Sequence, residues 1–150
     1  MAIHDREGHD DVLHILDQEG WPERVIMHCF SGGADLAREC VRHGAWLSFP
    51  GVLTFKNAER TRQALHATPV DKILVETDAP FLTPHPRRGK RNGPYLIAHT
   101  IRFLSEQLDW DEASCCEQLR RNTLAAYGGP WEDVHGVTPL QLPASGEETR

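Results

Sequence analysis

The chain has 150 residues, of which 39% are hydrophobic and 25% are charged, and its formal net charge is −6. This composition is typical of a soluble globular protein, long enough for one domain with its own core. The negative balance argues against a generally basic surface that coats nucleic acid, although a few local cations can still hold a phosphate group.

Neither a targeting segment nor a membrane segment is visible in the sequence. The N-terminal run MAIHDREGHDD is charged within five residues and lacks the apolar region of a signal peptide. No stretch approaches the roughly 18 consecutive apolar residues of a membrane-spanning helix. The four cysteines include no CxxC pair, which argues against a disulfide framework or a zinc knuckle. We therefore expect a cytoplasmic protein with reduced thiols and no membrane partner.

Apolar periodicity alternates between strand-like and helix-like along the chain. In chain order, the expected elements are a strand stub at Ala2-Ile3, a helix over residues 10–19, a strand over 24–30, a helix over 34–43, a strand over 45–49, a helix over 57–67, a strand over 72–76, and helices over 94–108 and 111–127. Asp109 or Asp111 is expected to cap the last helix. Residues 1–128 would form the folded part, and residues 129–150 an irregular or disordered tail.

Strands that alternate with helices predict right-handed βαβ units and a parallel sheet, hence an α/β fold. The strands are apolar throughout, as expected where both faces of a sheet are covered. The proline-, glycine- and arginine-rich loop over residues 83–93 (TPHPRRGKRNG) follows the third strand. It lies on the side of the sheet where such folds place their functional sites.

Three polar residues lie at or just beyond the carboxyl ends of apolar strands, namely His4, His28 and Asp78. In a parallel sheet these ends converge on one face, so the three side chains could share a metal ion. Imidazole nitrogen and carboxylate oxygen are ligands for zinc, manganese and similar ions. A bound divalent ion lowers the pKa of water to about 7, and an aspartate can hold that water and take its proton.

Simpler interpretations exist for each of these features. A histidine at a strand end is often an ordinary hydrogen-bonded residue, and an aspartate there often caps the next turn. The loop carries four positive charges within five residues, at Arg87, Arg88, Lys90 and Arg91. Guanidinium groups bind phosphate oxygens well, but a solvated turn explains such a run equally.

The segments IHDREGHDDVLHIL, HCFSGG, WLSFPGVLTFKNA, ILVETDAPFLTP and RRGKRN, in this order, resemble the second half of a TatD-family deoxyribonuclease. The resemblance runs from residue 3 to about residue 127. It implies a TIM-type (β/α) barrel of the metal-dependent hydrolase superfamily, truncated here to about strands five to eight. By the same resemblance, His4, His28 and Asp78 are metal ligands, on strands five, six and eight.

The resemblance also implies a function. The family hydrolyses DNA with a divalent metal (Mg, Mn or Zn), often as a 3′–5′ exonuclease. Asp78 would then be the catalytic residue, and DNA the substrate. Arg6, Arg88, Lys90 and Arg91 would contact the phosphate backbone.

Two departures from the family pattern stand out. The family begins with an H-x-H pair and a later glutamate, both of which fall outside this chain. Met1 is therefore expected to be either a mis-assigned start, which is the favoured interpretation, or the start of a degraded gene. The family pattern N-E-P is here Asn92-Gly93-Pro94. Strands five to eight alone cannot close a barrel, and their open edges predict marginal stability or self-association.

Two alternative functions stay open. The chain could be an inactive truncated remnant, which the missing ligands and Gly93 favour, while the intact His28, Asp78 and RRGKRN segment count against it. A different amidohydrolase chemistry, such as lactone or phosphotriester hydrolysis, ranks lower, because HCFSG together with ETDAP points to the nuclease.

Overall fold

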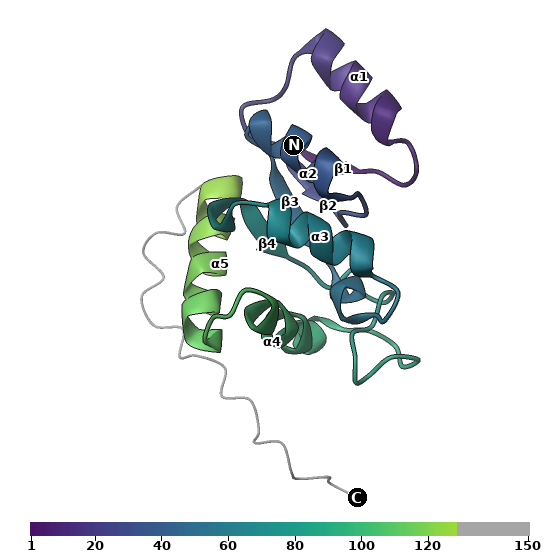
Figure 1. Cartoon of the computed structure of the whole chain (residues 1–150), viewed down its shortest axis with the longest axis vertical. Coiled ribbons are helices and arrows are strands. Elements are labelled where there is room, and N and C mark those ends of the chain that lie inside the picture. Colours follow the sequence, from purple (N-terminus) through teal and green to yellow (C-terminus); the bar gives the residue numbers. More distant parts are fainter. Residues whose placement is uncertain (129–150) are drawn as a thin grey trace, which may run out of the picture.

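Four parallel strands form the centre of the fold (Figure 1). The structure, a computed structural model, describes residues 1–128, so the tail expected over residues 129–150 lies outside the described residues. The strands are β1 (Ala2–His4), β2 (Ile26–His28), β3 (Trp46–Phe49) and β4 (Ile73–Val75). They lie in the order β1-β2-β3-β4, and every neighbouring pair is parallel, as the alternating pattern predicts.

Helices connect the strands and follow the last one. They are α1 (His9–Glu19), α2 (Ala34–Arg42), α3 (Glu59–Ala67), α4 (Ile97–Gln107) and α5 (Glu112–Tyr127), with short 3-10 turns η1 (Gly51–Thr54), η2 (Val70–Lys72) and η3 (Pro94–Leu96). Each expected helix is present to within a few residues, and η3 lies within the range expected for the helix over residues 94–108. The sequence pattern does not predict η1 or η2. Asp111, rather than Asp109, caps α5, because its side chain accepts a hydrogen bond from the Ser114 amide at 3.0 Å.

One face of the sheet packs against helices. Met27, Leu47 and Ile73 lie on this face at the same level of three neighbouring strands. They join one buried cluster with side chains of α2, α3, α4 and α5, of which Cys40, Leu65, Leu104 and Leu119 are examples. Figure 1 shows α2 and α3 side by side in front of the sheet, which agrees with their close packing.

The opposite face carries a second, smaller apolar cluster that leads to the candidate site. Ile26, Trp46 and Leu74 are buried there together with Ala126 of α5. Because successive strand residues point to opposite faces, His28 shares this face with Ile26, and Glu76 shares it with Leu74. Apolar residues on both faces are what the unbroken apolar strands predict.

β1 and β4 are the edge strands of the sheet that residues 1–128 form. The sheet is therefore open on both sides, as expected for strands that cannot close a barrel. No helix within residues 1–128 is long and apolar enough to cross a membrane.

Candidate metal centre

Three side chains with ligand atoms meet at the carboxyl ends of β2 and β4. His28 is the last residue of β2, Glu76 is the first residue after β4, and Asp78 follows two residues later. The His28 imidazole has Nδ1 2.8 Å from Oε2 of Glu76 and Nε2 3.7 Å from Oδ1 of Asp78. One ligand atom from each residue lies within 4.8 Å of the others. The parallel sheet thus brings together residues that are about fifty positions apart.

This geometry fits a divalent metal ion. Two ligand atoms that each lie about 2.1 Å from one ion at a tetrahedral angle are roughly 3.4 Å apart. The 3.7 Å between His28 Nε2 and Asp78 Oδ1 is close to this spacing. One nitrogen and carboxylate oxygens form a donor set that zinc and manganese accept. His28 and Asp78 are the residues that would hold the ion.

Glu76 orients the His28 ring and leaves one oxygen unused. Its Oε2 faces His28 Nδ1 and also accepts a hydrogen bond from the Cys29 amide at 3.1 Å. Its Oε1 is buried and has no hydrogen-bond partner. A buried carboxylate oxygen without a donor is costly, so this atom also favours a cation at the site. The carboxylate–histidine pair matches the arrangement that commonly supports a metal ligand.

His4 lies beside this group without joining it. It is the last residue of β1 and is paired in register with His28, so the two rings are neighbours, 5.6 Å apart between centroids. His4 is exposed, and its ring is not among the side chains whose ligand atoms converge within 4.8 Å. Of the three expected ligands, the structure therefore brings His28 and Asp78 together and places His4 at their edge.

Two residues of the site have unusual backbone conformations. Cys29 and Asp78 have positive φ angles of 52° and 55°, in the left-handed region that side chains other than glycine seldom adopt. Such conformations persist only where the surroundings impose them, and they gather at functional sites. Burial raises the pKa of the Cys29 thiol to about 12, and the Asp78 and Glu76 carboxylates add to the rise. The same negative charge attracts a cation.

Asp78 is not the cap of a helix or turn. Within residues 1–128, its carboxylate accepts no backbone hydrogen bond. Only its carbonyl takes part in the turn, as the acceptor for the Phe81 amide at 2.9 Å. The carboxylate is therefore free to face His28.

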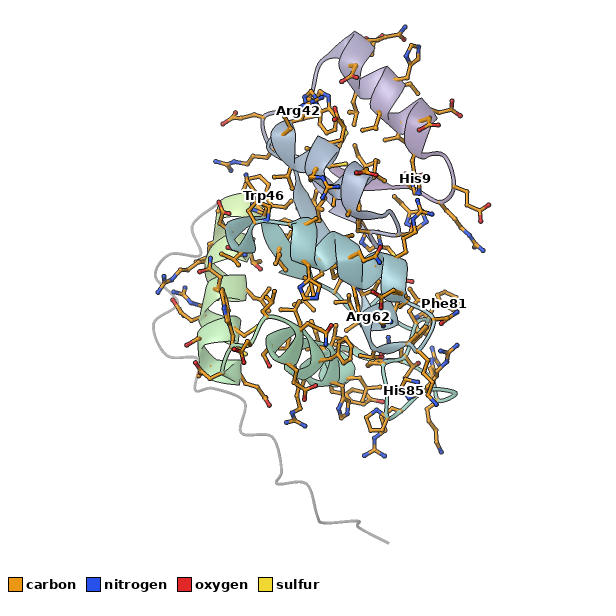
Figure 2. The ribbon with its side chains drawn as sticks, in the orientation of Figure 1. His9, Arg42, Trp46, Arg62, Phe81 and His85 are labelled. Atoms are coloured by element: carbon orange, nitrogen blue, oxygen red, sulfur yellow. The ribbon has the colours of Figure 1, made fainter. Side chains whose placement is uncertain are left out.

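A pocket of about 640 Å³ opens next to these residues, which is within the size range of ligand sites. His4, Arg6 and Asp78 line it, so the structure places Arg6 beside two of the expected ligands. Phe81 also lines the pocket and is 69% exposed, so it stands at the rim (Figure 2). The pocket thus combines a cation, a carboxylate and an aromatic side chain.

The basic loop lies on the same side of the molecule but does not line this pocket. Arg88 sits over the Phe55 ring, 3.8 Å from its centroid, while Lys90 and Arg91 are exposed. His85 lies edge-on to the same Phe55 ring, 6.3 Å away between centroids. The structure thus places Arg88, Lys90 and Arg91 on a surface next to the site rather than within it.

The departure at Gly93 has a local structural basis. Gly93 is buried, and a Cβ atom built there would lie 2.5 Å from the Tyr95 ring. The Tyr95 side chain therefore occupies the space that a side chain at position 93 would need. Any larger residue at this position requires Tyr95 to move.

Sequence reasoning missed Glu76. Glu76 belongs to the ETDAP segment, in which the family resemblance predicts a role for Asp78 alone. The strand pattern contains the signal, because Glu76 is two residues beyond Leu74 and so lies on the same face of the sheet as the site.

Comparison with known proteins identifies the family of the chain. Residues 1–128 match the family described as TatD related DNase. The chain is 44% identical, over 131 residues, to the "uncharacterized metal-dependent hydrolase TatD" of Mycobacterium tuberculosis, and the match covers 87% of this chain and 50% of that protein. It is 48% identical, over 108 residues, to the "uncharacterized metal-dependent hydrolase YabD" of Bacillus subtilis, covering 71% of this chain and 42% of that protein.

A solved structure of a TatD homolog has a similar fold. The fold is similar to that of YjjV, a TatD homolog from Escherichia coli K12, with a TM-score of 0.79 and 27% identity, over 86% of this chain and 50% of that chain. The chain thus spans about half the length of the relatives that it matches. The match over residues 1–128 shows that the chain belongs to the TatD related DNase family.

Proposed function

We propose that this chain is the carboxyl-terminal half of a divalent-metal-dependent hydrolase that cleaves phosphodiester bonds of DNA. The observation that carries the proposal is the meeting of His28, Glu76 and Asp78 at the carboxyl ends of parallel strands. Family membership and the names of the relatives, which are metal-dependent hydrolases, support it.

His28 and Asp78 would hold the metal ion, with His4 as a third candidate ligand. When bound, a divalent ion lowers the pKa of a water molecule to about 7 and polarises a phosphoryl oxygen. Asp78, whose carboxylate is free of backbone hydrogen bonds, would orient that water and accept its proton. Arg6, in the same pocket, would neutralise a phosphate oxygen.

The basic loop would extend the contact along the DNA strand. Lys90 and Arg91 are exposed, and Arg88 is held in place over Phe55. Cations of this kind contact phosphates without reading the base sequence. The assignment as a 3′–5′ exonuclease comes from the family resemblance.

The four strands would correspond to strands five to eight of a (β/α) barrel, with residues 1–128 as the second half of that domain. The face that carries Ile26, Trp46 and Leu74 would then line the interior of the barrel. A hollow of about 440 Å³ lies on this face and reaches His28 and Glu76. An upstream half would cover it and would add the ligands that the family carries there.

Cleavage of a 5′-labelled single-stranded DNA tests the proposal. The purified chain is incubated with Mg²⁺, with Mn²⁺ or with EDTA, beside the Asp78→Ala variant. Metal-dependent cleavage that is lost in the variant supports the proposal, and in the 150-residue chain alone it would indicate that copies associate. Cleavage that persists in EDTA, or in Asp78→Ala, contradicts it. A folded chain that does not cleave would instead favour the inactive half-barrel.

A further inference from the structure

Asn92, at the end of the basic loop, holds the turn that carries Asp78 through its side-chain amide and its backbone amide. Its Nδ2 donates to the carbonyl oxygens of Thr77 at 2.7 Å and of Phe81 at 2.6 Å. Its backbone amide donates to the carbonyl oxygen of Pro80 at 3.1 Å. Its Oδ1 accepts from the Gly93 amide at 2.9 Å. The side chain is only 5% exposed, so these hydrogen bonds are shielded from water.

The two carbonyl groups that Asn92 binds lie on either side of Asp78. Between them the chain makes a tight turn, in which Phe81 donates to the Asp78 carbonyl and Asp78 adopts a φ of 55°. A non-glycine residue stays in this conformation only where its surroundings impose it. One buried amide that bridges both ends of the turn is such a constraint.

We infer that Asn92 is a positioning residue for the metal centre: it fixes the turn from Thr77 to Phe81 and so holds the Asp78 carboxylate toward His28. The inference rests on the proposed metal site. The carboxylate lies 3.7 Å from His28 Nε2 only while this turn is kept. A rotation of the turn would separate the two ligands without changing either of them.

The same residue connects the basic loop to the metal centre. Thr83 Oγ1 donates to the carbonyl oxygen of Lys90 at 2.6 Å, which closes the base of the loop two residues before Asn92. Through Asn92 the loop is then attached to the backbone on both sides of Asp78. The position of the loop cations and that of the carboxylate are thereby set by one side chain.

A purely structural role is the competing interpretation, and Asn122 of α5 is a matched control for it. Asn122 is 2% exposed, and its Nδ2 also donates to two carbonyl oxygens, those of Val70 at 2.7 Å and Ile73 at 2.8 Å. These carbonyls lie at the amino end of β4, whereas Asp78 follows its carboxyl end. Both residues are thus buried and donate to two carbonyl oxygens, but only Asn92 does so beside Asp78. Their side-chain oxygens differ in partner, because that of Asn122 accepts from the Gln118 side chain at 2.8 Å.

The test compares Asn92→Asp with Asn122→Asp in the whole chain. The aspartate side chain has no N–H group, so in each variant two carbonyls lose their side-chain donor and face a carboxylate. The first readout is hydrogen exchange without metal. We expect the amides of residues 78–81, of which Pro80 has none, to exchange about tenfold faster or more in Asn92→Asp, and to be unchanged in Asn122→Asp. Should either aspartate variant fail to fold, Asn92→Ala and Asn122→Ala remove the same donors without adding charge.

The second readout is Co²⁺ binding, followed by the visible absorption of the bound ion, with Asp78→Asn as the site reference. We expect Asn92→Asp to weaken binding roughly 10- to 100-fold, as loss of a supporting group around a metal commonly does, and Asn122→Asp to weaken it by less than about twofold. Equal effects of the two variants, or unchanged exchange of residues 78–81 in Asn92→Asp, would overturn the inference. Binding that does not depend on Asp78 would refute the metal centre itself, and the inference would fall with it.

Discussion

Glu76 contacts the His28 ring through Nδ1, at 2.8 Å, and leaves Nε2 on the side of Asp78. A carboxylate on one ring nitrogen sets the tautomer, so that the other nitrogen presents its lone pair. The arrangement prepares His28 to bind a cation before any cation arrives. In the proposed metal centre, the glutamate and the aspartate of the ETDAP segment would thus have different roles although they are two residues apart.

Replacing Glu76 should therefore weaken metal binding without removing a necessary ligand. We expect Glu76→Ala to lower the affinity for Mn²⁺ about 10- to 100-fold, because the His28 ring loses its orientation. Glu39→Ala is the matched control, since Glu39 also contacts a histidine, His43, at 3.3 Å on α2 away from the site. Isothermal titration calorimetry gives both affinities. Equal affinities in the two variants would mean that Glu76 does not support the site.

Arg62 should stabilise the segment between β3 and α3. Its guanidinium group is only 16% exposed and donates to the carbonyl oxygens of Leu53 at 3.2 Å and Phe55 at 2.8 Å. We expect Arg62→Ala to lower the free energy of unfolding by about 1–3 kcal/mol, because these carbonyls lose their donor. Arg38 is exposed and pairs with Asp35 on α2, so Arg38→Ala should lower the free energy of unfolding by less than about 0.5 kcal/mol. Urea unfolding measures both, and similar losses would disprove the role of Arg62.

The buried thiol of Cys40 predicts a loss of stability in alkali. Burial raises its pKa from 9.0 to about 12 in the folded chain. A group with a raised folded pKa contributes stability that is complete below the unfolded pKa and is lost as the pH rises toward the folded value. The window here is therefore about pH 9 to 12.

In this window, ionisation of the Cys40 thiol should lower the free energy of unfolding of the wild-type chain by about 1.4 kcal/mol per pH unit. The variant Cys40→Ala lacks the thiol and should not show this loss. The free energies of unfolding of the wild-type chain and of Cys40→Ala, measured by urea unfolding, should therefore become more similar as the pH rises from 8 to 11. Ser105→Ala, at a buried side chain that does not titrate, should differ from wild type by a constant amount. A constant difference for Cys40→Ala as well would contradict the predicted shift.

Lys90 should contribute to DNA binding through charge alone. It is exposed on the basic loop, so we expect Lys90→Ala to weaken binding of single-stranded DNA equally for different sequences. The slope of log affinity against log salt concentration should fall by about one. Fluorescence anisotropy at several salt concentrations measures this slope. Arg121→Ala, which removes an exposed cation paired with Glu117 on α5, should leave it unchanged. An unchanged slope in Lys90→Ala would exclude the loop from the interface.

Much of the fold follows from the sequence, because its signals are local. The apolar runs that end at His28 and precede Glu76 predict parallel strands, and the glycines and prolines between them mark the ends of helices. The meeting of His28 and Asp78 could also be predicted, since carboxyl ends of parallel strands converge at one edge.

What could not be predicted depends on long-range geometry. The role of Asn92 arises from two carbonyl groups that are 11 and 15 residues away, and no periodicity encodes such a contact. The expected strand over residues 24–30 is only Ile26–His28 in the structure, because the chain turns at Cys29, where φ is 52°. His4 stays a predicted ligand, and the position of its ring relative to His28 depends on how β1 is placed at the edge of the sheet.

The most direct test of the metal centre is calorimetric titration of the chain with Mn²⁺, beside Asp78→Asn and the control Asp35→Asn. The Asp35 side chain is fully exposed on α2, so its change alters net charge equally without touching the site. We predict one saturable Mn²⁺ site in the wild-type chain. Its affinity for Mn²⁺ should fall by an order of magnitude or more in Asp78→Asn and stay unchanged in Asp35→Asn. Equal affinity in all three proteins, or no binding by the folded wild-type chain, would contradict a metal centre at His28 and Asp78.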